Sequence, residues 1–237
     1  MRSSVRWLGT GAGLAVAAYA SCAGITWFLY GHPRRNVRSG EEEPLLDQFI
    51  PDYEVVERPR MLVAAPVEIA FASACEMNIQ ESGIVRAIFR TRTLFLGGEP
   101  ERETRPLGLI EQARAWGWGI LAENPGREIV FGGVTQPWLA NPTFRALPPD
   151  EFRGFHEPGY VKIAWTLRAD PVSAEKSILR SETRAITTDR SSRAKFRRYW
   201  SFVMPGTAVI RRMALRMVKA EAEHRARSAM ASESLTS

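Results

Sequence analysis

The stretch that decides the fold runs from Tyr160 to Trp200 and reads YVKIAWTLRADPVSAEKSILRSETRAITTDRSSRAKFRRYW. Its residues 160–168 and 176–187 alternate apolar with polar side chains, which is typical of half-buried antiparallel strands. Asp189 is a suitable N-cap, and large apolar residues follow it at helical spacing. These residues are Phe196, Tyr199, Trp200 and Val203. The stretch therefore predicts a strand pair that is closed by an amphipathic C-terminal helix.

The alternation also predicts which side chains of the two strands face each other. The register that keeps charge on one face pairs Trp165 with Ser181 and Ile163 with Thr183. Bulky residues of one strand then oppose small residues of the other beneath the helix. The small residues either accommodate the helix aromatics by close packing or leave a cavity, and both interpretations stay open.

The chain before this stretch predicts the rest of one α+β domain. Residues 53–64 are typical of a strand, and Pro59 places that strand at an edge or a bulge. Pro66 fits the first turn of a helix, and a second helix is expected over residues 81–95. The C-terminal helix is expected to break or kink at Pro205-Gly206. The elements thus run from strand to helices to sheet to helix.

A second hairpin is predicted around the turn Asn124–Arg127. The turn has proline and then glycine at its two central positions, which is the signature of a type II turn. That turn pairs Ile120 with Phe131 and Ala122 with Ile129 across the hairpin. The hairpin therefore adds two strands to the predicted antiparallel sheet.

The N-terminal run Trp7–Tyr30 is apolar and has no charged residue over 24 positions. Because about 20 apolar residues span a bilayer core, a single-pass transmembrane helix is expected here. A cleaved signal peptide is the alternative. The expected organisation is a membrane anchor, a tether, a folded domain and a flexible tail, over residues 1–31, 32–52, 53–226 and 227–237.

The positive charge of the chain is concentrated at its N-terminus. The formal charge is +6, and residues 1–39 carry five arginines and no acidic residue. The rest of the chain is therefore nearly neutral, which argues against a nucleic-acid partner. Cys75 has no disulfide or metal-type spacing, so the domain is expected on the cytoplasmic side of the membrane. No metal or cofactor is expected, because no histidine, cysteine and carboxylate set has ligand spacing.

The predicted order of elements resembles the helix-grip fold of the START-like superfamily (SRPBCC, Bet v 1-like, polyketide cyclase-like). That fold is a curved antiparallel sheet wrapped on a long C-terminal helix. Residues 121–128 (LAENPGRE), 181–184 (SETR) and 196–200 (FRRYW) are similar to a bacterial branch of it, and the likeness covers about residues 53–225. The resemblance implies a deep apolar cavity for lipids, polyketides, steroids or other hydrophobic ligands. Some members are cyclases or hydrolases, and many are carriers.

The expected function is membrane-anchored binding of a hydrophobic small molecule or lipid between the sheet and the C-terminal helix. The residues expected to line the space are Trp118, Ile120, Phe131, Ile163, Trp165, Thr183, Phe196 and Trp200. A cyclase- or dehydratase-type enzyme that uses the same cavity is one alternative. A non-catalytic structural membrane protein with a filled core is the other.

Catalysis has only weak candidates in this sequence. His156 is more typical of an ordinary surface or capping histidine than of a general base. The strand register places Glu182 and Arg184 on a solvated outer face, with their side chains away from the helix. The resemblance would equally allow this pair to face the C-terminal helix. The direction of Arg184 therefore decides between the two hypotheses.

The C-terminal helices are strongly basic. Residues 190–227 hold eleven lysines and arginines and two acidic residues. One interpretation is a solvated helix face, and the other is contact with anionic lipid headgroups at the membrane surface. Arg211 and Arg212 are the residues predicted to make that contact.

Overall fold

The computed structural model of the protein describes residues 20–21, 24–25, 43–78 and 107–236. The predicted second helix, over residues 81–95, and nearly all of the expected membrane anchor lie outside the described residues. Within them, no helix combines the length and the apolar character that crossing a membrane requires.

The described residues form one antiparallel sheet of eight strands. The long strand β6 lies at its centre, with β4 and then β3 on one side and β7 and β8 on the other. β1 and β2 form the far edge beside β8 and β7, and β5 pairs with β4. The bounds are β1 Val55–Glu57, β2 Arg60–Val63, β3 Gly119–Asn124, β4 Glu128–Thr135, β5 Phe144–Arg145, β6 Val161–Ser173, β7 Lys176–Arg180 and β8 Thr183–Thr187.

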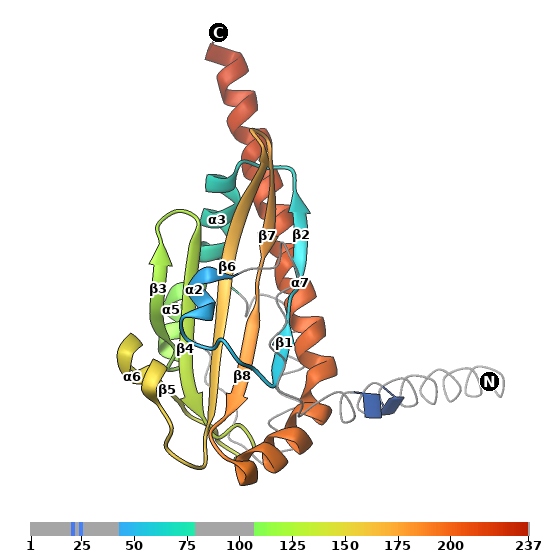
Figure 1. Ribbon diagram of the computed structural model, residues 1–237. Coiled ribbons are helices and arrows are strands. Elements are labelled where there is room, and N and C mark those ends of the chain that lie inside the picture. Colours follow the sequence, from blue (N-terminus) through green and yellow to red (C-terminus); the bar gives the residue numbers. More distant parts are fainter. Residues whose placement is uncertain (1–19, 22–23, 26–42, 79–106, 237) are drawn as a thin grey trace, which may run out of the picture.

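Helices cover both faces of this sheet. The helices are α2 Pro44–Asp47, α3 Val67–Glu76, α5 Leu109–Ala115, α6 Pro149–Gly154 and α7 Arg190–Thr236. α3, α5 and α7 lie on one face, called the inner face here, and share an apolar core with it. α2 and α6 lie against the opposite, outer face and share a second core with it (Figure 1). A curved antiparallel sheet packed on a long C-terminal helix is the α+β helix-grip arrangement that the sequence predicts.

At the β1/β2 edge, the edge strand and its neighbour are interrupted at the same level. β1 ends before Arg58-Pro59, and β7 and β8 are separated by Ser181-Glu182. Pairing keeps one register across the break, and the Ser181 amide donates to the Pro59 carbonyl at 3.1 Å. The Glu182 amide donates to the hydroxyl of Thr166 on β6 at 3.0 Å. The irregularity that Pro59 predicts is therefore confirmed, and it extends into the neighbouring strand.

The strand pair that decides the fold has the predicted faces but a different register. Trp165 pairs with Thr183 and Ile163 with Ala185, so the predicted partners were wrong by two residues. The reason is that β6 continues to Ser173 and turns within two residues, which fixes the pairing from the turn. Because the shift is an even number of residues, every side chain keeps its predicted face.

The hairpin of β3 and β4 shows a similar combination. The pair Ile120 and Phe131 is confirmed, and Gly126 has the positive φ of +75° that a type II turn requires. Ala122 pairs with Val130, not with Ile129, because a bulge follows Ile120.

α7 is one continuous helix over 47 residues, so of the break or kink predicted at Pro205-Gly206 only a kink is compatible with the structure. A proline inside a helix removes one backbone hydrogen bond and bends the axis without ending the helix. The hydroxyl of Thr207 donates to the Met204 carbonyl at 2.9 Å at this level. Figure 1 shows that α7 changes direction in its first third and then follows the inner face. The helix also continues through the expected flexible tail, where the side chains of residues 227–232 are exposed.

Candidate functional site

A row of side chains crosses the centre of the inner face. Backbone pairing aligns Ile120, Phe131, Trp165, Thr183 and Glu57 on five neighbouring strands, and we call this set the central row. The rings of Phe131 and Trp165 stack with centroids 4.3 Å apart. The structure thus brings four of the predicted lining residues together and adds a carboxylate, Glu57, that the sequence analysis did not assign to the site.

Two more predicted residues flank the central row. The ring of Trp118 meets Trp165 edge-on at 6.1 Å and stacks on Phe144 of β5 at 4.3 Å. Ile163 pairs with Gly133 on β4 beside it. A connected group of aromatic rings therefore forms the floor of the inner face.

The inner face is closed at both ends by packed side chains. At one end Leu167 and Leu179 pack beneath α3 and the second half of α7. At the other end Phe196 and Trp200 pack with Val161. The two α7 aromatics that were predicted to line the space therefore lie at one end of it, on the same face of the sheet as Trp165.

Between these ends the inner face is only partly covered. None of the α7 residues 202–214 is buried, whereas Ser201 and Leu215 on either side are. The sheet side chains opposite are partly exposed too, namely Trp118, Ile120, Ile163 and Trp165. Two of these side chains, Ile163 and Trp165, belong to the central strand β6, where apolar side chains on a helix-covered face are expected to be buried.

A charged pair spans this partly covered middle. Arg211 of α7 donates through Nη1 to Oε2 of Glu57, and both side chains are more than three-quarters buried. The other carboxylate oxygen, Oε1, is buried and has no hydrogen-bond partner among the described residues. Burial raises the pKa of the Glu57 carboxyl, and Arg211 opposes that rise. A buried acceptor without a donor is costly, so it marks a place where a ligand donor would be favourable.

The position of Arg211 corrects its predicted role. Its guanidinium points to Glu57 on the sheet, so it does not lie on a helix face that meets lipid headgroups. Its neighbour Arg212 is exposed. A basic helix pattern identifies arginines but does not tell which of them turns toward the sheet.

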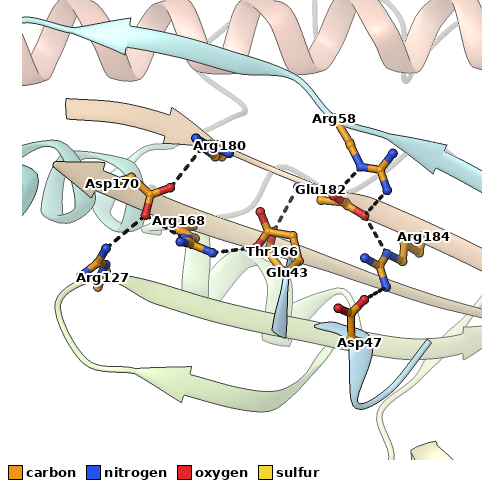
Figure 2. Close-up of polar contacts among 10 residues, drawn as sticks. All are labelled: Glu43, Asp47, Arg58, Arg127, Thr166, Arg168, Asp170, Arg180, Glu182 and Arg184. Atoms are coloured by element: carbon orange, nitrogen blue, oxygen red, sulfur yellow. Dashed lines mark hydrogen bonds and ion pairs between the residues drawn. The ribbon is translucent and has the colours of Figure 1, made fainter. Parts of the chain in front are cut away.

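Glu182 and Arg184 lie on the outer face, as the register predicts, but that face is not solvated. Arg184 is only 2% exposed, and its Nε donates to Glu182 at 2.6 Å. Its Nη1 donates to Asp47 of α2 at 2.5 Å and to the Ile50 carbonyl at 2.8 Å. Arg58 also donates to Glu182, at 2.7 Å (Figure 2). This pair therefore attaches the segment 43–53 to the sheet. Most of that segment lies in the predicted tether, residues 32–52, so this part of the tether is packed on the domain.

The three weak catalytic candidates do not meet beneath α7. Glu182 and Arg184 are held in the outer-face network, and His156 is exposed after α6. Among the residues that the structure describes, no three histidine, cysteine or acidic side chains are grouped as a metal ion would require. An acid–base role in the inner space could therefore fall to Glu57, but not to these three residues.

A second ionic group on the outer face centres on Asp170. Asp170 accepts from Arg168 at 2.8 Å and lies 3.1 Å from Arg180 and 3.3 Å from Arg127. Arg168 also reaches Glu43, at 3.4 Å (Figure 2). The segment before α2 is thus attached to the sheet through Glu43 as well as through α2.

Glu43 makes this attachment sensitive to pH. The pKa of the Glu43 carboxyl is raised to about 7, because burial and the carboxylates of Glu128 and Glu182 together outweigh the lowering by Arg168. The folded state therefore keeps a proton between about pH 4.5 and 7 that the unfolded chain has released. It follows that this contribution to stability is complete at low pH and is lost as the pH rises through 7.

Replacing Glu43 with glutamine is expected to remove that pH dependence. Between pH 5 and 8 the wild type should lose about 1–2 kcal/mol more than the variant in free energy of unfolding. The measurement is urea unfolding of the full chain in a non-ionic detergent, followed by tryptophan fluorescence. Glu151→Gln, at an exposed glutamate of α6, is the control and should follow the wild type. Equal slopes for wild type and Glu43→Gln would exclude Glu43 as the titrating group.

Comparison with known proteins finds solved structures that are similar at low identity. No protein-family model and no curated protein matches the chain. Similar solved structures include the Zhui aromatase/cyclase from Streptomyces sp. R1128, with 16% identity over 74% of this chain and 97% of that one and a TM-score of 0.25. Norcoclaurine synthase from Thalictrum flavum, in complex with dopamine and hydroxybenzaldehyde, has 12% identity over 81% and 98%, with a TM-score of 0.27.

The di-domain aromatase/cyclase StfQ from the steffimycin biosynthetic pathway has 16% identity over 73% of this chain and 52% of that one, with a TM-score of 0.31. Two of these three neighbours are aromatase/cyclases by name. At TM-scores below 0.5 this likeness carries no argument, so the function has to be argued from the residues of this chain.

Proposed function

We propose that the centre of the inner face binds a hydrophobic small molecule or lipid. The observation that carries the proposal is the partial exposure of Trp165 in the central strand, on a face whose two ends are closed. Covering apolar surface contributes roughly 25 cal/mol per Å², before the cost of ordering the ligand. The ligand would lie along the central row, beneath residues 202–214 of α7.

Glu57 and Arg211 would hold a polar group of that ligand. Oε1 of Glu57 can accept a hydrogen bond, and Arg211 uses only one of its guanidinium nitrogens in the pair. A hydroxyl group would satisfy both the acceptor and the remaining donors. The proposed ligand is therefore largely apolar, with a hydroxyl or a similar group at the end that faces β1.

A cyclase- or dehydratase-type reaction is the second candidate, and Glu57 is the observation that favours it. Its raised pKa brings a carboxyl toward the range in which it can exchange protons near neutral pH. Such a reaction would use the same space and the same polar anchor. In that case the chain purified from cells would carry two related masses, a substrate and its product.

The proposal extends to the location of the domain. The uncharged run Trp7–Tyr30 would hold it at a membrane as a single-pass anchor, with the domain on the cytoplasmic side. A membrane would then be the source of the hydrophobic ligand.

Replacing Ile163 with tryptophan is expected to displace the ligand, because the larger ring would fill the space beside Trp165. Native mass spectrometry of the full chain, purified from cells in a non-ionic detergent, should show a bound small mass in the wild type and none in the variant. The thermal midpoint should stay close to that of the ligand-free wild type. If the interior is instead filled by the protein, the variant is overpacked and loses about 1–3 kcal/mol.

Leu62→Trp is the matched control, because Leu62 of β2 is 54% exposed and lies on the outer face. This variant should retain the bound mass and the thermal midpoint of the wild type. A wild type that is consistently empty, or an Ile163→Trp variant that still carries the ligand, would contradict the proposed function.

A further inference from the structure

Three arginines stand side by side on the outer face. Backbone pairing places Arg60 of β2 opposite Arg180 of β7, and Arg180 opposite Arg168 of β6. We call these three residues the arginine row. Like charges directly opposite each other in a sheet are destabilising. The row therefore needs compensation from nearby anions.

The carboxylates of the protein compensate the row only in part. Arg168 has two carboxylate partners, Asp170 and Glu43. Arg180 shares the same Asp170 through its buried Nε, which lies 3.1 Å from Oδ2 as an ion pair but without the geometry of a hydrogen bond. Arg60 is exposed and forms no ion pair within the described part of the chain. Positive charge is thus left over at the β2 end of the row.

A pocket of about 190 Å³ opens at this end of the row. It lies where the strands are interrupted, and it is lined by Glu43, Arg58, Pro59, Arg60, Arg180, Ser181 and Glu182. Water takes about 30 Å³ per molecule in the liquid, so the pocket holds a phosphate-sized anion and several waters. It is separate from the inner face, because the outer-facing row points away from α7.

The two carboxylates in the pocket wall do not fill the role of this anion. Both oxygens of Glu182 are already used, because Oε1 accepts from Arg184 and Oε2 accepts from Arg58. The raised pKa of Glu43 reduces its negative charge near neutral pH. An incoming anion would therefore meet more positive than negative charge.

We propose that this pocket binds an oxyanion of the phosphate class, held by the guanidinium groups of Arg60 and Arg180. The planar guanidinium matches two oxygens of such an anion at once, which a single ammonium group cannot do. Ser181, in the interruption between β7 and β8, lines the pocket between the two ionic groups. The anion can be free phosphate or the phosphate of a lipid headgroup.

The test is calorimetric titration of the full chain in a non-ionic detergent with inorganic phosphate, at fixed ionic strength against chloride. A second arm compares detergent micelles with and without phosphatidic acid. The wild type is expected to bind in at least one arm, and that arm identifies the source. Arg60→Gln and Arg180→Gln should weaken binding about 10-fold or more, because each removes charge-assisted hydrogen bonds.

Arg216→Gln, at an exposed arginine of α7, is the matched control and should bind like the wild type. Arg60→Gln keeps the test valid if Arg180→Gln does not fold, because Arg60 is exposed. If chloride at the same ionic strength displaces phosphate completely, or if Arg216→Gln weakens binding as much as Arg60→Gln does, the binding is general charge attraction. Either result would overturn the proposal. Absence of binding in both arms would overturn it as well.

Discussion

Replacing Arg184 with methionine is expected to lower the free energy of unfolding by about 3–5 kcal/mol. The side chain is 2% exposed and donates to Glu182, to Asp47 and to the Ile50 carbonyl. Its guanidinium also lies 4.8 Å from the centre of the Tyr53 ring. Methionine fills a similar volume but leaves the buried Ile50 carbonyl without its guanidinium donor and leaves the buried Glu182 carboxylate with Arg58 alone. The large expected loss comes from the lost hydrogen bonds to these buried groups, not from an empty space.

Urea unfolding of the full chain in a non-ionic detergent measures this loss, and Arg127→Met is its matched control. Arg127 is 46% exposed and pairs with Asp170 at 3.3 Å, so its replacement should cost less than about 1 kcal/mol. Arg184→Met should also make the segment 43–53 accessible to limited proteolysis. If the two variants are equally stable, the outer-face network does not hold that segment.

The faces of the central strands could be predicted from the sequence, because side-chain direction follows from strict alternation. Trp165 and Arg184 lie on the faces that the pattern assigns to them, although the register moved by two residues. A register is set by the turn, and an alternating pattern fits equally well after an even shift. The pattern therefore determines which face of the sheet each side chain occupies, but it does not determine its partner on the neighbouring strand.

The cover of the outer face could not be predicted from that alternation. A polar side chain away from the helix is expected to meet water, but Glu43 and the apolar residues of 46–50 pack there instead. One signal was present, since residues 53–64 are apolar on both alternating sets, and a strand with two apolar faces is covered on both. The inward position of Arg211 had a similar signal. Glu57 lies two residues from Val55 and so shares its core-facing side of β1, where a carboxylate needs a cationic partner.

Replacing Gly117 with alanine is expected to cost at least about 3 kcal/mol, since strain and a backbone clash act together. Gly117 has a φ of +89°, which L residues rarely adopt, and a Cβ there would overlap the Phe144 carbonyl oxygen. A backbone oxygen cannot move aside as a flexible side chain can. Phe144 stacks on Trp118, which meets Trp165, so the clash would also displace the aromatic floor. The variant should therefore lose the bound mass as well as stability.

Gly126→Ala separates the clash from the strain. Gly126 has a similar φ of +75°, but a Cβ there would meet nothing within 4 Å. Alanine at this turn should cost only about 1–2 kcal/mol, which is the price of the left-handed backbone alone. It should leave the ligand bound, because the turn is remote from the aromatic floor. Equal losses of stability at the two glycines would mean that the Phe144 backbone moves away, and that the position of Trp118 does not depend on the strand-to-strand contact at Gly117.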